Sequence, residues 1–175
     1  SFMPSGQVSH YYNASRLSEM ILGVFAFAIT TAAFPELSKY TSDANWQKIR
    51  STMRFTTATT FLIVIPASMG LLFAAEPIVS MLYLHGEYKW NDVQNTALIL
   101  KAFALSIPAV ALVRFKTSVF FSLKDSFTPV KISIVSILVT GILGWWWSQR
   151  LEIFGLGLGL VAGTWFQFIM LRLFL

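Results

Sequence analysis

The sequence contains no cysteine and only two histidines, His10 and His85. The lack of cysteine excludes disulfides, a thiolate nucleophile and cysteine-ligated metal sites, and two separated histidines predict no histidine cluster. Charged residues are also scarce, at 12% of the 175 positions. The basic residues are spread over several connecting segments without forming a basic face, which argues against a nucleic-acid partner. We therefore expect no metal site, no cofactor and no nucleic-acid binding.

Apolar residues are abundant: they make up 55% of the sequence, and the mean hydropathy is +0.65. Such a composition is typical of membrane proteins. A hydrocarbon core about 30 Å thick takes roughly 20 helical residues to cross, and lipid requires each segment to satisfy its own backbone groups. We predict an all-α polytopic transmembrane helix bundle forming a single domain over residues 1–175. The expected spans are residues 17–37, 52–75, 93–121, 129–147 and 153–173.

The two ends of the sequence lack the marks of a complete chain. It begins at Ser1 without an initiator methionine and stops at Leu175 inside a hydrophobic segment. No basic region followed by a short apolar run, as in a secretory signal, stands at the start. We expect the sequence to be a fragment of a longer chain.

Basic residues are divided unequally between the two sides on which the connecting segments would lie. Lys89 and Arg150 fall on one side, and nine basic residues fall on the other. By the positive-inside rule, the larger group places the segment 38–51 in the cytoplasm and the start of the chain outside. The tryptophans at 145–147 would then end the fourth span in the outer headgroup layer, where indole rings are favoured. The nine residues are Lys39, Lys48, Arg50, Arg54, Arg114, Lys116, Lys124, Lys131 and Arg172.

Proline and glycine mark two features of helix packing. Pro66 and Pro108 fall inside expected spans, where each removes a helical hydrogen bond and bends the axis, either as a packing kink or as a hinge. Gly155, Gly159 and Gly163 recur every four residues and form one small face that allows another helix to approach closely. We expect the last span to pack against protein along this face.

Arg16 and Glu19 stand three residues apart at the start of the first expected span. At 100° per residue, Gly23 and Thr30 continue the same helical face. One interpretation is an interfacial pair whose charges neutralise each other. The alternative, which we prefer, is a polar stripe that faces a cavity and binds substrate, because a snorkelling arginine requires no polar continuation of its face.

Lys101 lies about two turns, roughly 12 Å, into the third expected span. It is either a snorkelling side chain or a further cavity-lining residue. The sequence has no paired carboxylates on a shared face, no Ser/His/Asp set and no glycine-rich phosphate loop, so we predict no enzyme.

The opening run "YNASRLSEMILGVFAFAITTAAFPELS" resembles the signature of the MurJ (MviN) lipid II flippases. The segments "IPASMGLL", "LHGEYKWND" and "KDSFTPVKI" are similar to further landmarks of that family in the same order. The resemblance covers the whole chain. It implies a fourteen-helix transporter of the multidrug/oligosaccharidyl-lipid/polysaccharide exporter superfamily, built from two six-helix lobes and two additional helices.

Placed on this family, the chain would comprise the end of helix seven and helices eight to twelve, most of the second lobe. The resemblance implies that Arg16 lines the central cavity, with Glu19 beside it, and that the first lobe of the same chain supplies the other cavity arginines. The implied partners are membrane lipids and lipid II or a similar polyprenyl-pyrophosphate saccharide. The implied location is the bacterial inner membrane, where the parent protein would flip lipid II outward by alternating access.

Two alternatives remain open from the sequence. One is a flippase or exporter of another polyprenyl-linked saccharide, since such relatives share the architecture. The other is a non-transporting membrane scaffold for cell-wall synthesis, which would tolerate the loss of Arg16 while keeping the glycine face.

The charge asymmetry predicts which end of each span is accessible from which side of the membrane. A cysteine placed at Ser42 should react with a membrane-impermeant thiol reagent only from the cytoplasmic side, and a cysteine at Asn91 only from outside. Labelling of intact cells and of inverted membrane vesicles measures both. The reverse pattern would overturn the predicted orientation.

Overall fold

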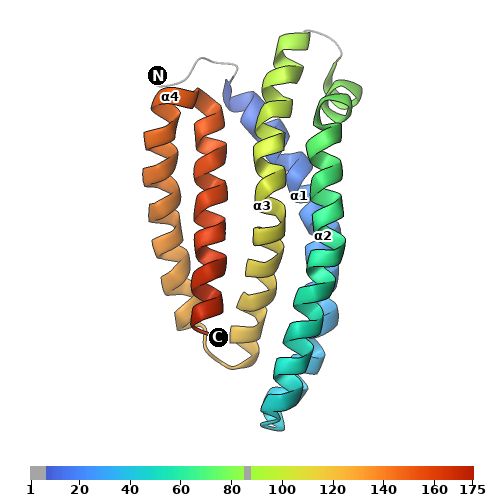
Figure 1. The fold of residues 1–175 in the computed structure, drawn as a ribbon, viewed down its shortest axis with the longest axis vertical. Helices are drawn as coiled ribbons and strands as arrows, with labels where there is room; N and C mark the ends of the chain where they lie inside the picture. Colours follow the sequence, from blue (N-terminus) through green and yellow to red (C-terminus); the bar gives the residue numbers. More distant parts are fainter. Residues whose placement is uncertain (1–6, 85–87) are drawn as a thin grey trace.

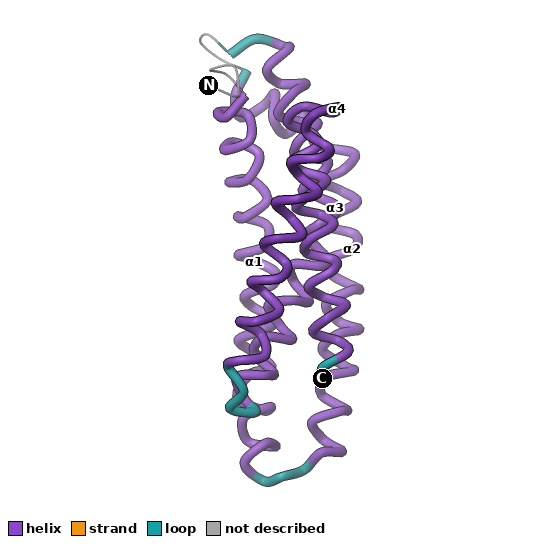
Figure 2. Tube along the Cα trace, turned by 90° about the vertical axis from the view of Figure 1, so that its left-hand side faces the viewer, coloured by secondary structure: helices purple, strands orange, loops and turns teal. Residues whose placement is uncertain are grey.

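The computed structural model describes residues 7–84 and 88–175, except for the side chains at 7, 8, 25–27, 152 and 153. Within these residues the chain forms four helices: α1 (Gln7–Ser42), α2 (Trp46–Tyr83), α3 (Trp90–Ser122) and α4 (Phe127–Leu173). The helices run side by side along one long axis (Figures 1 and 2). This arrangement confirms the predicted all-α bundle. Residues 85–87 of the motif "LHGEYKWND" lie outside the described residues.

Two of the four helices depart from a single straight span. Figure 1 shows α4 as two antiparallel halves, and each half, Phe127–Leu151 and Phe154–Leu173, is long and apolar enough to cross a membrane. The halves of α1, Ser9–Val24 and Ala28–Ser42, are inclined to each other by 42°. Together with α2 and α3, the described residues provide four membrane-crossing helices, or five when the bent pair in α1 is counted as one span. The protein is a multi-pass membrane protein.

Short connecting segments between the helices are closed by local hydrogen bonds. The side chain of Asn45 accepts a bond of 3.1 Å from the Lys48 amide at the start of α2. Asp125 accepts bonds of 3.1 Å from the amides of Phe127 and Thr128 at the start of α4. The hydrogen bonds from Thr128 lower the pKa of the Asp125 carboxyl below its ordinary value because they favour the charged form. These caps satisfy amides that a helix start leaves unpaired.

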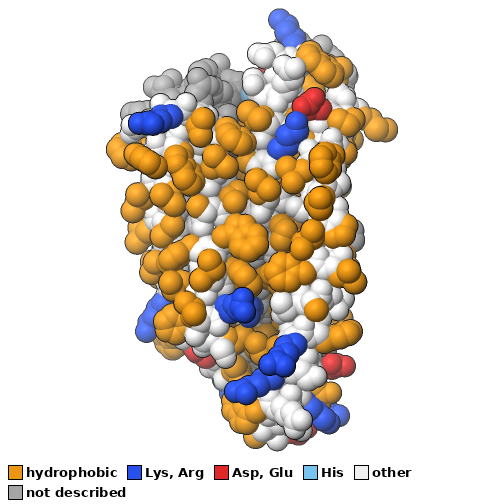
Figure 3. Space-filling view, viewed as in Figure 1, with side chains coloured by type: hydrophobic (Ala, Val, Ile, Leu, Met, Phe, Trp, Pro, Cys, Tyr) orange, Lys and Arg blue, Asp and Glu red, His pale blue; other side chains and the backbone are white. Residues whose placement is uncertain are grey.

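Helix α3 lies at the centre of the bundle, with α1, α2 and α4 packed against it. Within its most apolar window 72% of the residues are buried, against 28% in α2 and 22% and 33% in the two halves of α4. Large apolar side chains on α2 and α4, such as Phe73, Met81 and Ile137, point outward instead. Figure 3 shows this apolar surface over most of one face. We assign these outward faces to lipid, since a soluble protein rarely exposes so large an apolar surface.

Pro108 in the middle of α3 leaves the Ala104 carbonyl without its helical amide partner, because proline has no N–H. The Ser68 hydroxyl of α2 donates a hydrogen bond to that carbonyl. On the other side, the Trp165 indole of α4 donates a bond of 3.2 Å to the neighbouring Leu105 carbonyl. Neighbouring helices therefore satisfy the carbonyls around the proline. These bonds favour the packing interpretation of Pro108 over the hinge interpretation.

The three glycines of the last span face the first half of α4. A Cβ at Gly159 would lie 2.5 Å from the Cα of Gly144, and one at Gly163 would overlap the side chain of Thr140. The Ser136 hydroxyl also donates a hydrogen bond of 2.7 Å to the Gly163 carbonyl. The predicted close packing of the glycine face is confirmed, and the contact holds the two halves of α4 together.

Replacing Gly159 should destabilise the protein in proportion to the size of the new side chain. Overpacking typically costs about 1 to 3 kcal/mol, so we expect Gly159→Ala to lower the melting temperature in detergent and Gly159→Leu to reduce the amount of folded protein strongly. Gly141→Ala is the matched control, since a Cβ at Gly141 meets no atom within 4 Å. Fluorescence-detected size exclusion after heating measures all three. Equal behaviour of Gly159→Leu and Gly141→Ala would contradict the packing argument.

Candidate functional site

The first half of α1, Ser9–Val24, has one buried face and one open face. Ala14, Ser18 and Leu22 are buried against the bundle at every fourth residue. The opposite side is exposed. It carries Tyr12, Arg16, Glu19 and Gly23, which we call the exposed stripe of α1, next to the apolar side chains of Met20 and Val24. A polar, uncovered stripe on an otherwise apolar membrane helix is expected to meet a polar environment.

Arg16 is held in place by the side chain one turn before it. Its guanidinium donates a hydrogen bond of 2.6 Å to the Tyr12 hydroxyl and lies 4.5 Å from the centre of the Tyr12 ring. A guanidinium has five N–H donors in a planar fork, so one bond to Tyr12 leaves the others available. Tyr12 thereby orients Arg16 without neutralising its charge. We did not predict Tyr12 as a site residue, although its i, i+4 spacing from Arg16 was a usable signal.

Glu19 is exposed on the same stripe. Among the described residues its carboxylate forms no ion pair with Arg16, whose contacts are to Tyr12. The structure therefore places the two charges near each other along the helix without pairing them. This geometry speaks against the interpretation in which the pair merely neutralises itself.

Gly23 and Thr30, which the helical projection put on one face, have different surroundings in the structure. A Cβ at Gly23 would meet no atom within 4 Å, so open space adjoins the stripe there. Thr30 lies beyond the 42° change of direction in α1 and is half-buried, and its hydroxyl oxygen is inaccessible and has no hydrogen-bond partner among the described residues.

Lys101 of α3 forms an ion pair with Glu76 of α2, with 2.6 Å between Nζ and Oε1. The two side chains retain 34% and 46% of their exposure, so the pair lies at the edge of the bundle. No described contact joins Lys101 to Arg16 or Glu19. Glu76 had not been singled out in the sequence, because it follows the expected span 52–75 and lies 25 positions from its partner.

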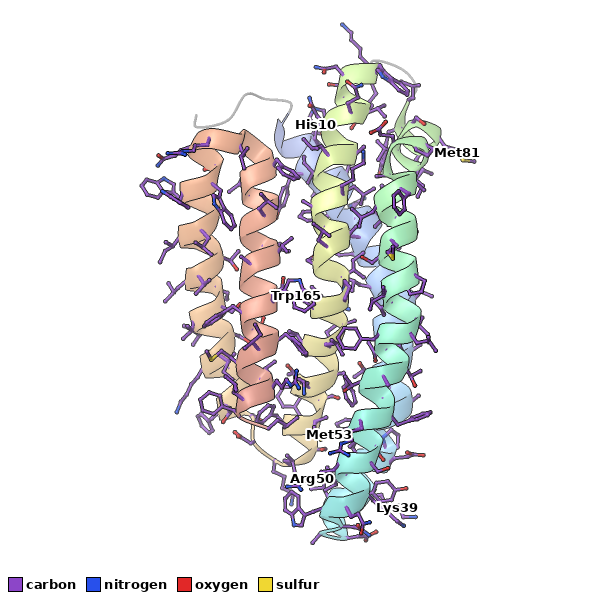
Figure 4. All side chains as sticks on the ribbon, viewed as in Figure 1. His10, Lys39, Arg50, Met53, Met81 and Trp165 are labelled. Carbon is purple, nitrogen blue, oxygen red and sulfur yellow. The ribbon has the colours of Figure 1, made fainter. Side chains whose placement is uncertain are left out.

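A buried polar cluster ties the start of α1 to the start of α3. The Nδ1 atom of His10 lies 3.3 Å from the Tyr88 hydroxyl and 3.2 Å from the Thr96 hydroxyl, and Nε2 lies 3.5 Å from the Asp92 carboxylate. Figure 4 shows His10 at this end of the bundle, beside α3. The cluster fixes the first turns of α1, and with them the position of Arg16. Among the described residues no group of three or more His, Cys, Asp or Glu side chains is arranged to hold a metal ion.

Because Glu76 and Lys101 form an ion pair, we predict that removing either charge alone destabilises the protein. Glu76→Gln or Lys101→Met should each lower the melting temperature, while the double variant should recover part of the loss. We expect a coupling of up to about 1 kcal/mol, given the partial exposure of the pair. Arg150→Gln, an exposed cation near the same end, is the control. Strictly additive effects of the two substitutions would show that the pair contributes nothing.

Comparisons with known proteins bear on the family and the fold of the chain. A family model described as "Lipid II flippase MurJ" matches residues 1–175. The probable lipid II flippase MurJ of Bdellovibrio bacteriovorus is 32% identical over 139 residues, which cover 79% of this chain and 27% of that protein. The probable lipid II flippase MurJ of Vibrio cholerae is 30% identical over 152 residues, which cover 85% of this chain and 29% of that protein.

A solved structure titled "Lipid II flippase MurJ, inward closed conformation" superimposes with a TM-score of 0.87 at 24% identity. The superposition covers 95% of this chain and 35% of that one, and it shows that the two share a fold. The chain thus spans between 27% and 35% of the length of these three proteins. Because the family model matches the whole of residues 1–175, the chain belongs to the lipid II flippase MurJ family.

Proposed function

We propose that the chain is most of the second lobe of a two-lobe flippase, and that the complete protein moves lipid II from the inner to the outer leaflet of the bacterial inner membrane. The observation that carries the proposal is the exposed stripe of α1. In a chain of this family, Arg16 is exposed on a membrane helix, and its contacts with the described residues leave several of its hydrogen-bond donors unused. The first lobe, which these residues do not include, would close the cavity over it.

The chemistry of Arg16 matches the headgroup of the proposed substrate. Lipid II carries a pyrophosphate, whose oxygens accept charge-assisted hydrogen bonds from the planar guanidinium fork. The Tyr12 ring packs against the guanidinium and restricts the rotamers of Arg16 before a ligand binds. The Arg16 side chain therefore loses less conformational freedom on binding. Glu19, which has no partner of its own among the described residues, would orient Arg16 in the loaded state or take part in ion coupling.

The packing of the bundle supports transport by alternating access of rigid lobes. Hydrogen bonds from α2 and α4 to the carbonyls around Pro108 fasten both helices to α3, and the His10 cluster fastens α1 to α3. A lobe held together in this way would rock against its partner lobe as a unit. The cavity with Arg16 would open first to the cytoplasmic leaflet and then to the outer one.

Arg16 variants of the full-length protein test the proposal. Arg16→Ala should abolish growth support and lower lipid II flipping at least tenfold, because a hydrogen bond to a charged group is worth about 1.5 to 3 kcal/mol. Membrane abundance should stay near normal, since the exposed side chain contributes little to folding. Arg16→Lys should rescue only partly, because an ammonium lacks the planar fork. Complementation, matched immunoblots and a lipid II accessibility assay provide the readouts.

Glu19→Gln and Tyr12→Phe are the companion variants, and Arg150→Gln is the control. Glu19→Gln should impair transport at unchanged abundance, and Tyr12→Phe should give an intermediate defect because it keeps the ring and loses the hydroxyl. Full activity of Arg16→Ala at normal abundance would remove Arg16 from the site and favour the scaffold alternative. Retained flipping of a different polyprenyl-linked saccharide, with none of lipid II, would favour the other transport alternative.

A further inference from the structure

A second basic site lies on a different face of the bundle. A cavity of about 460 Å³ opens between α2, α3 and the second half of α4 near the C-terminus of the chain. We call it the basic cavity. Its lining includes one cation from each helix, Arg54, Lys116 and Arg172, beside Thr57, Phe61 and Phe168. No residue of α1 lines it, and in Figure 1 α1 crosses behind α3 and continues behind α2, so the cavity is separate from the exposed stripe of α1.

The basic cavity holds more positive charge than the described residues neutralise. None of its described lining residues is acidic. Lys116 is only 6% exposed, and within the described part of the chain its ammonium forms no ion pair; it lies 5.9 Å from the centre of the Phe168 ring. Arg172 lines the same cavity as Lys116, so two positive charges share one site. A buried ammonium without a counter-charge is costly, so this arrangement calls for an anion.

The depth of the basic cavity matches the headgroup layer of the leaflet. Lys116 stands six residues before the end of α3, about 9 Å along the axis, and Arg172 lies in the last turn of α4. Figure 3 shows Lys and Arg side chains gathered at this lower end of the face. The charge asymmetry of the sequence assigns the same end to the cytoplasm.

The shape of the site points to a lipid and not to a free ion. Helices α2 and α4 both pack mainly on α3, which leaves the cavity open toward the side of the bundle. Phe61 and Phe168 provide apolar walls next to the cations; Met53, another lining residue, is labelled on α2 in Figure 4. A lipid phosphate would bind the cations, and its acyl chain would pack along the apolar walls.

We propose that the basic cavity binds the phosphate of an anionic phospholipid of the cytoplasmic leaflet. The bound phosphate supplies the counter-charge that the described residues do not provide for Lys116 and Arg172, and it joins α2, α3 and α4 at their cytoplasmic ends. This role is independent of the transported substrate and of Arg16.

Native mass spectrometry of the full-length protein in mixed micelles tests the proposal with phosphatidylglycerol and phosphatidylcholine of the same acyl chains. We expect a clear preference for phosphatidylglycerol in the unmodified protein. One basic side chain near the membrane surface contributes about 1 kcal/mol to anionic-lipid binding, which is about fivefold. Lys116→Met and Arg172→Gln should therefore each weaken phosphatidylglycerol binding about fivefold and leave phosphatidylcholine binding unchanged.

The control is the double variant Lys39→Gln/Lys131→Gln, which removes two exposed cations outside the basic cavity. It should retain the preference, and Lys116→Arg should retain it as well because the charge is kept. If Lys116→Met does not fold, Arg172→Gln and Lys116→Arg decide the question.

Two results would overturn the proposal. An equal loss of phosphatidylglycerol binding in the control would show a diffuse surface effect instead of a site. Displacement of phosphatidylglycerol by millimolar inorganic phosphate, with stabilisation of the protein by phosphate alone, would assign the site to the free ion. Neither result bears on transport, which the Arg16 variants test separately.

Discussion

The structure depends on one constraint: a helix interrupted by proline must satisfy its freed carbonyls inside a membrane. Pro108 lies in the middle of the most buried helix, where no water is available to donate a hydrogen bond to the carbonyl. Ser68 from α2 donates to the freed Ala104 carbonyl, and Trp165 from α4 adds a bond to the neighbouring Leu105 carbonyl. The same bonds that repair the backbone also fix the positions of α2 and α4 on α3. The interruption of α3 at Pro108 is therefore also the position at which α2 and α4 are bonded to α3.

The position of α1 follows from a second set of buried polar contacts. His10 meets Tyr88, Asp92 and Thr96 at one end of α3, and the buried face of α1 continues from that anchor. With one face buried, the other is left uncovered, and Arg16 lies on it. The proposed substrate ligand is therefore oriented by contacts on the far side of its own helix and by Tyr12 on the near side. Binding groups placed on a rigid element in this way lose little freedom when a ligand arrives.

Three basic residues have different environments, which the residues next to them in the sequence do not distinguish. Lys101 is paired with Glu76, Arg16 is exposed and held by an aromatic ring, and Lys116 is buried without a carboxylate among the described residues. A paired charge such as Lys101 contributes to the contact between two helices. A positive charge that is oriented or buried without a counter-charge remains available to bind an anion. Arg16 and Lys116 lie on different faces of the bundle. We propose that Arg16 binds the phosphate of a transported headgroup and that Lys116 binds the phosphate of a lipid in the surrounding leaflet.

The sequence by itself determined the helical bundle, the close-packed glycine face and the candidate Arg16, because these rest on hydrophobic runs and on spacings of three or four residues within one helix. It also predicted the membrane orientation, which remains a prediction. Only the tertiary structure decided that Glu76 neutralises Lys101, that His10 meets Asp92, and that Arg54, Lys116 and Arg172 share one cavity. It also showed that the Thr30 hydroxyl, expected on the same face as Arg16, is inaccessible, and that α1 changes direction by 42° between the two residues. Each of these depends on how whole helices lie against or bend past one another, and no local periodicity encodes contacts between residues far apart in the chain.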